Sequence, residues 1–226
     1  MPEFIYQPPH QKIEILFNDD DLLVANKPSG LLSVPGRLTQ HKDNLLTRLE
    51  LDFGTLHCVH RLDMDTSGLM LVARNKKTLS HLARQFQQRQ IQKTYQAIVY
   101  GKMEIDHGEI SAPLITDWPN RPRQKICEKT GKAALTAYQV IKACPNKTYI
   151  ELYPVTGRSH QLRIHMQSIN HPILGCRFYA HKKAQMASER LMLHAAKLGF
   201  IHPQTEQQIE IENNAAFWIY SSKSTS

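Results

Sequence analysis

The segment from Val59 to Gly68 constrains this chain more than any other, because it sets an aspartate among cations and turn formers directly before an apolar run. The second half of the segment has the composition of a turn, and Leu69–Ala73 is typical of a fully buried strand. A carboxylate placed there needs a cation or backbone donors to stay ionised. We therefore expect Asp63 to lie on a loop held by a rigid sheet, either as a functional carboxylate or as a turn cap paired with Arg61.

Strand patterns outnumber helix patterns along the chain. Two segments, 75–90 and 159–169, have the spacing or the opening residues of helices. The predicted strands cover 13–17, 22–26, 69–73, 94–100, 134–141, 149–155, 193–201 and 208–212. Because most of these strands are not separated by helices, the sequence predicts an α+β fold with a largely antiparallel mixed sheet.

The length of 226 residues and the hydrophobic content of 41% allow a substantial core. We expect one catalytic domain over 13–220, with an N-terminal extension over 1–12 and a disordered Ser-rich tail over 221–226. The amino terminus is polar, and no run of eighteen apolar residues predicts a membrane span. The expectation is a soluble, cytoplasmic monomer with no membrane partner.

The charge balance favours a polyanionic partner. Lys and Arg number 28 against 20 Asp and Glu, and the sequence pI is near 9.3. The cysteines form no CxxC pair, so we expect reduced thiols and neither a zinc ribbon nor a disulfide framework. They are Cys58, Cys127, Cys144 and Cys176.

The twelve histidines suggest a metal enzyme as an alternative. Its ligands would be His57 with His60, or His160 with His165. Neither spacing matches an HExxH or Cys/His pattern, so we expect scattered histidines and no metal ion.

Two further segments offer partners for a functional Asp63. Thr156–His165 follows a strand-like run and opens a helix, which places four cationic or titratable side chains within about two turns. Gln92–Tyr100 is an alternating, β-prone stretch that carries Tyr95.

The motifs HRLDxxTSG, KxY and GRxHQLR, in that order, resemble the RluA family of pseudouridine synthases. The resemblance extends from about residue 13 to residue 202, and within the family it is closest to the dual-specificity type, which acts on ribosomal and transfer RNA. Cys176 departs from the pattern, since an Asp is expected after the HPILG run. Other matching segments are Asn26–Gly36, Asp117–Pro122, His171–Gly175 and Arg190–Ala195.

The resemblance implies the pseudouridine synthase fold, with a central active-site cleft, and an isomerase that needs no cofactor. It implies Asp63 as the carboxylate that attacks the sugar, attacks the base or assists a glycal route. Arg163 is implied as the cation that stabilises this carboxylate, and Tyr95 as the ring that faces the uracil and moves a proton. From the residues alone, the preferred interpretation of Arg163 is a solvated charge on a helix face, and Tyr95 can be an ordinary aromatic on a strand surface.

The expected substrates are specific uridines in large-subunit rRNA and in the anticodon stem-loop of tRNAs. A stacked uridine must be extruded, and His60 and Arg61 are placed to brace the gap or to orient Asp63. Arg121, Arg123 and Lys125 lie close to Trp118 in a basic segment that favours RNA contact over a merely solvated loop. A non-catalytic RNA-binding module is the alternative that the charge alone would favour.

Overall fold

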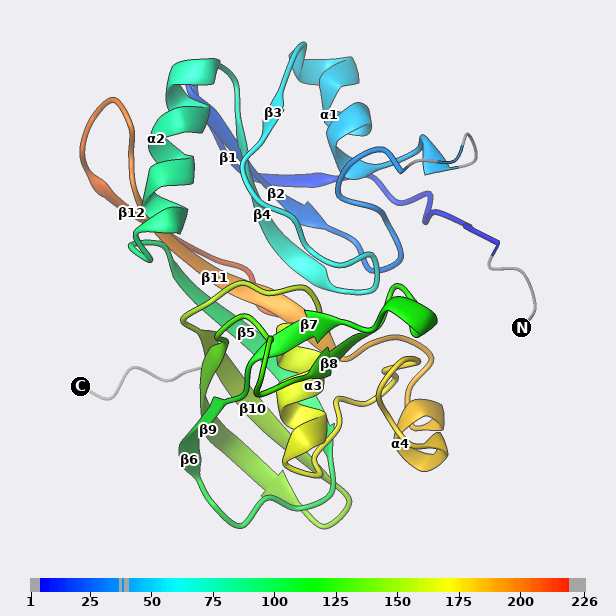
Figure 1. Ribbon diagram of the computed structural model, residues 1–226. Coiled ribbons are helices and arrows are strands. Elements are labelled where there is room, and N and C mark those ends of the chain that lie inside the picture. The colour runs from blue at the N-terminus through cyan, green and yellow to red at the C-terminus, as the bar shows by residue number, and fades with distance from the viewer. Residues whose placement is uncertain (1–4, 37, 39–40, 220–226) are drawn as a thin grey trace. The chain divides into compact units, whose positions relative to one another are not determined.

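The computed structural model describes residues 5–36, 38 and 41–219, and the chain divides into two compact units. Unit 1 comprises 1–92 and 197–213, and unit 2 comprises 93–196 and 214–226. The predicted single domain therefore stays a prediction, and the predicted tail 221–226 lies outside the described residues. Figure 1 labels the elements in chain order.

Unit 1 contains an antiparallel sheet in which β2 pairs with β1 and β4, and β4 also pairs with β3. The last residues of β11 belong to this unit and pair with β12. The strands are β1 (Glu14–Asn18), β2 (Leu22–Lys27), β3 (His57–Cys58), β4 (Ser67–Ala73), β11 (Leu193–Ile201) and β12 (Gln208–Glu212), and the helices are α1 (Leu45–Phe53) and α2 (Lys76–Gln87).

The two helices of unit 1 cover opposite faces of β2 and β4, because alternate residues of a strand point to opposite faces. Leu22 and Val24 pack in one cluster with Leu82 of α2. Leu23 and Ala25 pack in another with residues of α1, so β4, like β2, is apolar on both faces. This double cover explains why the strand after Asp63 reads as a continuous apolar run.

Unit 2 contains a second antiparallel arrangement, in the order β5, β10, β9, β6, and a separate hairpin of β7 and β8. The strands are β5 (Gln92–Tyr100), β6 (His107–Ser111), β7 (Leu114–Thr116), β8 (Gln124–Ile126), β9 (Leu135–Cys144) and β10 (Lys147–Pro154). The helices are α3 (Gln161–Ser168), α4 (Lys182–Met186) and the short 3₁₀ helix η2 (Trp118–Asn120).

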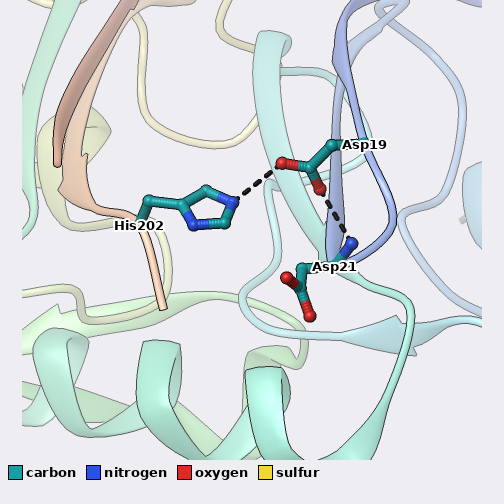
Figure 2. A group of neighbouring side chains, drawn as sticks. All are labelled: Asp19, Asp21 and His202. Carbon is teal, nitrogen blue, oxygen red and sulfur yellow. Dashed lines mark hydrogen bonds and ion pairs between the residues drawn. The ribbon is translucent and has the colours of Figure 1, made fainter. Parts of the chain in front are cut away.

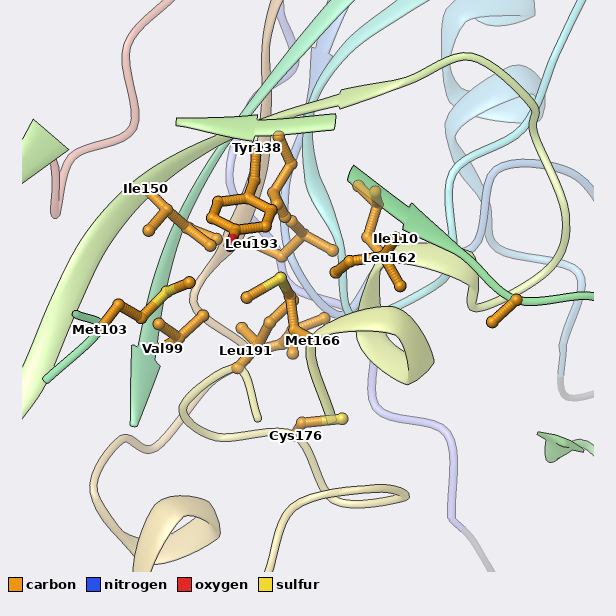
Figure 3. Close-up of a cluster of buried hydrophobic side chains, with 14 residues drawn as sticks. Val99, Met103, Ile110, Tyr138, Ile150, Leu162, Met166, Cys176, Leu191 and Leu193 are labelled. Atoms are coloured by element: carbon orange, nitrogen blue, oxygen red, sulfur yellow. The ribbon is translucent and has the colours of Figure 1, made fainter. Parts of the chain in front are cut away.

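Helix α3 covers one face of the unit 2 strands. Its Leu162 and Met166 pack in the largest buried cluster together with Val99, Ile150 and Leu193 (Figure 3). The opposite face carries Ile98 and Tyr149, which pack with α4 and with the C-terminal segment around Trp218.

These findings confirm the α+β class and the largely antiparallel sheet. Helix α2 falls within the predicted 75–90 and begins after Asn75, whose side chain accepts the N–H of Thr78. Helices α1 and α4, strands β3 and β6 and the β7–β8 hairpin were not predicted, and the basic segment that carries Arg121, Arg123 and Lys125 contains η2 and β8. All four cysteines are free thiols. Among the described residues, no helix is long and apolar enough to cross a membrane.

Candidate active site

The loop between β3 and β4 carries Asp63, which is partly buried. The N–H of Thr66 donates to the carbonyl of Asp63 at 3.1 Å and closes the turn that precedes β4. One residue earlier, Ser33 binds both backbone groups of Leu62. Its hydroxyl donates to the Leu62 carbonyl at 2.7 Å and accepts the Leu62 N–H at 3.1 Å. The backbone on both sides of Asp63 is therefore hydrogen bonded.

A buried lysine ties this loop to the segment that follows β2. Lys27 is 0% exposed, and its ammonium donates to the carbonyl oxygens of Pro28, Leu31 and Met64 at 2.9, 2.7 and 3.0 Å. The N–H of Gly30 also donates to Met64, at 2.8 Å. Three carbonyl oxygens thus surround a cation that could not be buried alone.

The two residues predicted to brace the RNA differ in their surroundings. Nε2 of His60 accepts the N–H of Leu71 at 2.9 Å, and the imidazole lies 4.7 Å from the ring of Phe86, centre to centre. His60 therefore helps to hold its loop against β4 and α2, and could serve as a metal ligand through Nε2 only by giving up that bond. Arg61 is exposed. RNA contact by both residues stays a prediction.

Tyr95 lies on β5 and faces α3. It shares its strand face with Ala97 and Val99, and it packs on the cluster that contains Leu162. Lys93 shares that face and is partly buried, and burial lowers its pKa below the usual value for a lysine.

Gln161 fixes the start of α3. Its side-chain carbonyl accepts the hydroxyl of Thr156 at 2.7 Å and the N–H of Arg158 at 3.0 Å. Its amide nitrogen donates to the carbonyl of Leu135 and to the hydroxyl of Thr136, both at 2.9 Å. One buried amide therefore joins the GRSHQLR turn to β9, and this sets where α3 begins.

Arg163 lies two residues after Gln161, in the first turn of α3, and is only 1% exposed. Its Nε donates to Sγ of Cys176 at 3.4 Å, and its guanidinium carbon lies 5.1 Å from the ring centre of Phe178 and 5.5 Å from that of Tyr179. Aromatic faces attract a guanidinium, most strongly where water is excluded. The alternative reading of Arg163 as a solvated helix charge is therefore wrong.

His165, on the same helix, is 0% exposed and is held by two bonds. Nδ1 lies 2.9 Å from the hydroxyl of Thr136, and Nε2 lies 3.1 Å from the carbonyl of Ala112. A carbonyl only accepts, so Nε2 carries the proton and Nδ1 accepts the hydroxyl. Both nitrogens are engaged, which argues against the predicted alternative of a His160–His165 metal pair.

Burial lowers the pKa of His165 below its usual 6.5. The unfolded chain then binds this proton more readily, so the stability from the neutral ring is present above pH 6.5 and is lost as pH falls below it. We expect the contribution of this group to the free energy of unfolding to decrease as pH falls below 6.5.

Urea unfolding across this pH range measures the effect. His165→Gln lowers stability at neutral pH but should flatten the slope, whereas the control His107→Gln, at an exposed position, should not. Equal slopes for wild type and His165→Gln would contradict the assignment.

The three predicted RNA-binding cations stand on or beside the β7–β8 hairpin, and all are exposed. The guanidinium of Arg121 lies 4.5 Å from the ring of Trp118, which is itself 67% exposed. Arg123 lies 6.0 Å from the ring of Phe178, and the ammonium of Lys125 lies 3.4 Å from a carboxylate oxygen of Asp117. These cations and the exposed indole form a surface suited to phosphates and unstacked bases.

A second polar cluster, in unit 1, consists of Asp19, Asp21 and His202 (Figure 2). Nδ1 of His202 accepts two backbone N–H groups, so Nε2 carries the proton that it donates to Asp19 at 2.8 Å. Burial pushes the pKa of Asp19 upward, but hydrogen bonds from the N–H groups of Leu22 and Asp21 and from His202 outweigh it and hold the pKa below its usual value. We assign this cluster a structural role, since it ties the β1–β2 turn to the end of β11.

The predicted catalytic residues fall on both units. Tyr95 and Arg163 lie in unit 2, Tyr95 on β5 and Arg163 on α3, which packs against β5. Asp63 lies in unit 1. The predicted roles of the three stay predictions. Sequence reasoning missed the contributions of Lys27, Gln161, Phe178 and Tyr179, although the first two lie inside segments that carried the family resemblance.

A family model for RNA pseudouridylate synthases matches residues 21–168, a span that includes Asp63, Tyr95 and Arg163. The chain therefore belongs to the RNA pseudouridylate synthase family, and it is an RNA pseudouridine synthase, an isomerase. The structure agrees. It resembles human RNA pseudouridylate synthase domain containing 1, with a TM-score of 0.78 and 27% identity over 96% of this chain and 87% of that one. It also resembles human RNA pseudouridylate synthase domain containing 4, with a TM-score of 0.70 and 27% identity over 88% of this chain and 87% of that one.

Several sequence relatives share one name, dual-specificity RNA pseudouridine synthase RluA. The chain is 51% identical to the protein of that name from Vibrio parahaemolyticus, over 88% of this chain and 82% of the relative. It is 50% identical to that of Pasteurella multocida, over 94% of this chain and 98% of the relative. It is also 50% identical to that of Escherichia coli K12, over 88% of this chain and 91% of the relative.

Proposed function

We propose that this protein converts uridine to pseudouridine in two kinds of RNA, at sites in large-subunit rRNA and in the anticodon stem-loop of tRNAs. The observation that carries the proposal is the identity of about half over most of the chain to relatives named as dual-specificity enzymes. The intact motifs around Asp63, Tyr95 and Arg163 support it. We also propose that the protein acts in the cytoplasm as a monomer.

The reaction breaks the bond between N1 of uracil and C1′ of the ribose, turns the base and joins C5 to C1′. Asp63 serves as the nucleophile, or stabilises the cationic sugar, and in each alternative it acts as a carboxylate. Arg163 supplies the cation that keeps this carboxylate ionised in a desolvated site. The burial of Arg163 supports the role, because a permanently charged group is rarely held out of water without a task.

The role proposed for Tyr95 is proton transfer, which the reaction requires at C5 and at N1 of the uracil. Once C5 has bonded to the sugar, its hydrogen must leave, and N1, which lost its bond to the sugar, must gain a proton. A phenol beside the base can accept the first proton and return one, and its ring presents a flat face to the uracil. The partial burial of Tyr95 against the α3 cluster supports this role, since it leaves the ring few ways to turn.

Recognition of the RNA rests on the exposed cations of the hairpin together with Arg61 and His60. Arg121, Arg123 and Lys125 contact phosphates, and Trp118 offers a face for an unstacked base. Because phosphate contacts release counterions, RNA affinity falls as salt rises, and neutralising these side chains weakens all substrates alike.

Two minimal RNA hairpins test dual specificity. One reproduces a tRNA anticodon stem-loop, and the other reproduces a large-subunit rRNA helix with the same loop sequence. We expect purified enzyme to form pseudouridine in both, because recognition through loop shape and a flipped base needs only a short stem-loop. The product is measured by nucleoside analysis, and hairpins with cytidine at the target position serve as controls.

Modification of one hairpin to completion, with the other unmodified, would contradict dual specificity and leave the enzyme class intact. Tight binding of both hairpins without product would support the alternative of an RNA-binding module.

A further inference from the structure

Three of the four residues that follow Gly175 contact the side chain of Arg163. Cys176 accepts its Nε, and Phe178 and Tyr179 present their rings to it. The guanidinium of Arg177 also lies over the ring of Phe178, with its carbon 5.0 Å from the ring centre. One short segment thus supplies three contacts to Arg163, and we call it the 176–179 segment.

The backbone of this segment has little freedom. Gly175 has a φ of +71°, and a Cβ at that position would lie 1.9 Å from the carbonyl oxygen of Arg190. The N–H of Gly175 donates to Ala184 at 3.0 Å, and the N–H of Ala180 donates to Cys176 at 3.1 Å. The backbone at the start of the segment is therefore constrained by its neighbours, and this constraint limits where its side chains can lie.

Tyr179 also reaches two other elements through its hydroxyl. The oxygen accepts the N–H of Gln124, in β8, at 2.9 Å. It is hydrogen bonded to Nδ1 of His160, the residue that precedes α3. The ring of His160 in turn stacks on Phe178, with 5.6 Å between the centres and 19° between the planes.

Phe178 and Tyr179 thus contact both the β7–β8 hairpin and α3. Arg123 of the hairpin lies near Phe178, and the backbone of β8 is bound to Tyr179. Arg163 of α3 contacts both rings. A displacement of the hairpin cannot leave Tyr179 in place without breaking the bond to Gln124, and a displacement of Tyr179 alters one of the faces that hold Arg163.

We propose that Tyr179 is a positioning residue whose hydroxyl couples the β7–β8 hairpin to Arg163, so that engagement of RNA by the hairpin also sets the guanidinium for the reaction. The inference rests on the proposed function, in which the hairpin contacts RNA and Arg163 takes part in the chemistry. It predicts that a change on the hairpin alters turnover as well as affinity, and that this effect on turnover passes through the Tyr179 hydroxyl.

Tyr179→Phe tests the coupling, because it keeps the ring over Arg163 and removes only the hydroxyl. A double-mutant cycle with Arg121→Ala measures kcat and KM on one RNA hairpin. We expect Tyr179→Phe alone to lower kcat/KM about tenfold, the loss that follows from two ordinary hydrogen bonds. We expect Arg121→Ala to lower kcat severalfold in the wild-type background, and to leave kcat unchanged in the Tyr179→Phe background, where it raises only KM.

Tyr153→Phe is the matched control. It removes a hydroxyl that donates to Glu151 from a partly buried tyrosine, and β10 turns Tyr153 away from the face that α3 covers. We expect its kinetics to match wild type. Thermal melting of both phenylalanine variants separates a loss of stability from a loss of coupling.

A kcat effect of Arg121→Ala that is equal in both backgrounds would overturn the proposal, as would wild-type kinetics for Tyr179→Phe. Either result leaves the proposed function intact as long as the wild-type enzyme forms pseudouridine in the RNA hairpin. Absence of that product would refute the proposed function itself.

Discussion

We expect Asp63→Asn to abolish pseudouridine formation, with a loss on the order of a thousandfold or more in single-turnover rate. The substitution keeps the shape of the side chain and removes its charge and its nucleophilicity. The backbone around residue 63 is held by Ser33 and by the turn to Thr66, so the loop should keep its conformation. RNA affinity should therefore stay within a few-fold of wild type.

Rapid-mixing assays on a stem-loop substrate measure the rate, and filter binding measures the affinity. Asp52→Asn serves as the control, since Asp52 is an exposed carboxylate on α1 of the same unit. Activity within about tenfold of wild type would contradict the role of Asp63, because that corresponds to only ~1.4 kcal/mol of transition-state stabilisation.

Arg163→Ala should lower activity by roughly a hundredfold or more, and Arg163→Lys should restore it only in part. A lysine keeps the charge but lacks the planar group that lies against Phe178 and Tyr179, and it has no Nε–H for Cys176. The alanine variant also leaves a cavity, because Arg163 is among the largest fully buried side chains.

Stability must therefore be followed together with activity. Arg158→Ala is the matched control, since Arg158 belongs to the same motif but is exposed, and its side chain donates to the carbonyl of Ala133. A folded and fully active Arg163→Ala enzyme would show that Arg163 has no part in the reaction.

The sequence predicted those strands and helices in which the local pattern of apolar residues determines which side chains are buried. The apolar run of β4 and the spacing of Leu79, Leu82 and Phe86 in α2 were sufficient. The hairpin was missed because β7 and β8 have three residues each and are separated by a segment with two prolines, a composition that is typical of a loop.

The catalytic candidates were predicted through the family motifs, but their supports were not. The bonds of Lys27 go to backbone carbonyls, one of them 37 residues away, and such an acceptor leaves no mark in the residue types. The cage around Arg163 was equally hidden, because Cys176, Phe178 and Tyr179 meet α3 only after the chain has turned through the HPILG run.

The ammonium of Lys27 has a consequence for the energetics of turnover. A flexible loop that carried Asp63 would lose conformational entropy each time the carboxylate adopted its reactive position, and that loss would add to the activation barrier. With Lys27, Gly30 and Ser33 fixing the carbonyls and the N–H on either side, the loop is ordered once, when the chain folds. In the proposed reaction, the barrier of each catalytic cycle then contains the unstacking of the uridine and the bond changes, and no ordering of the loop that carries Asp63.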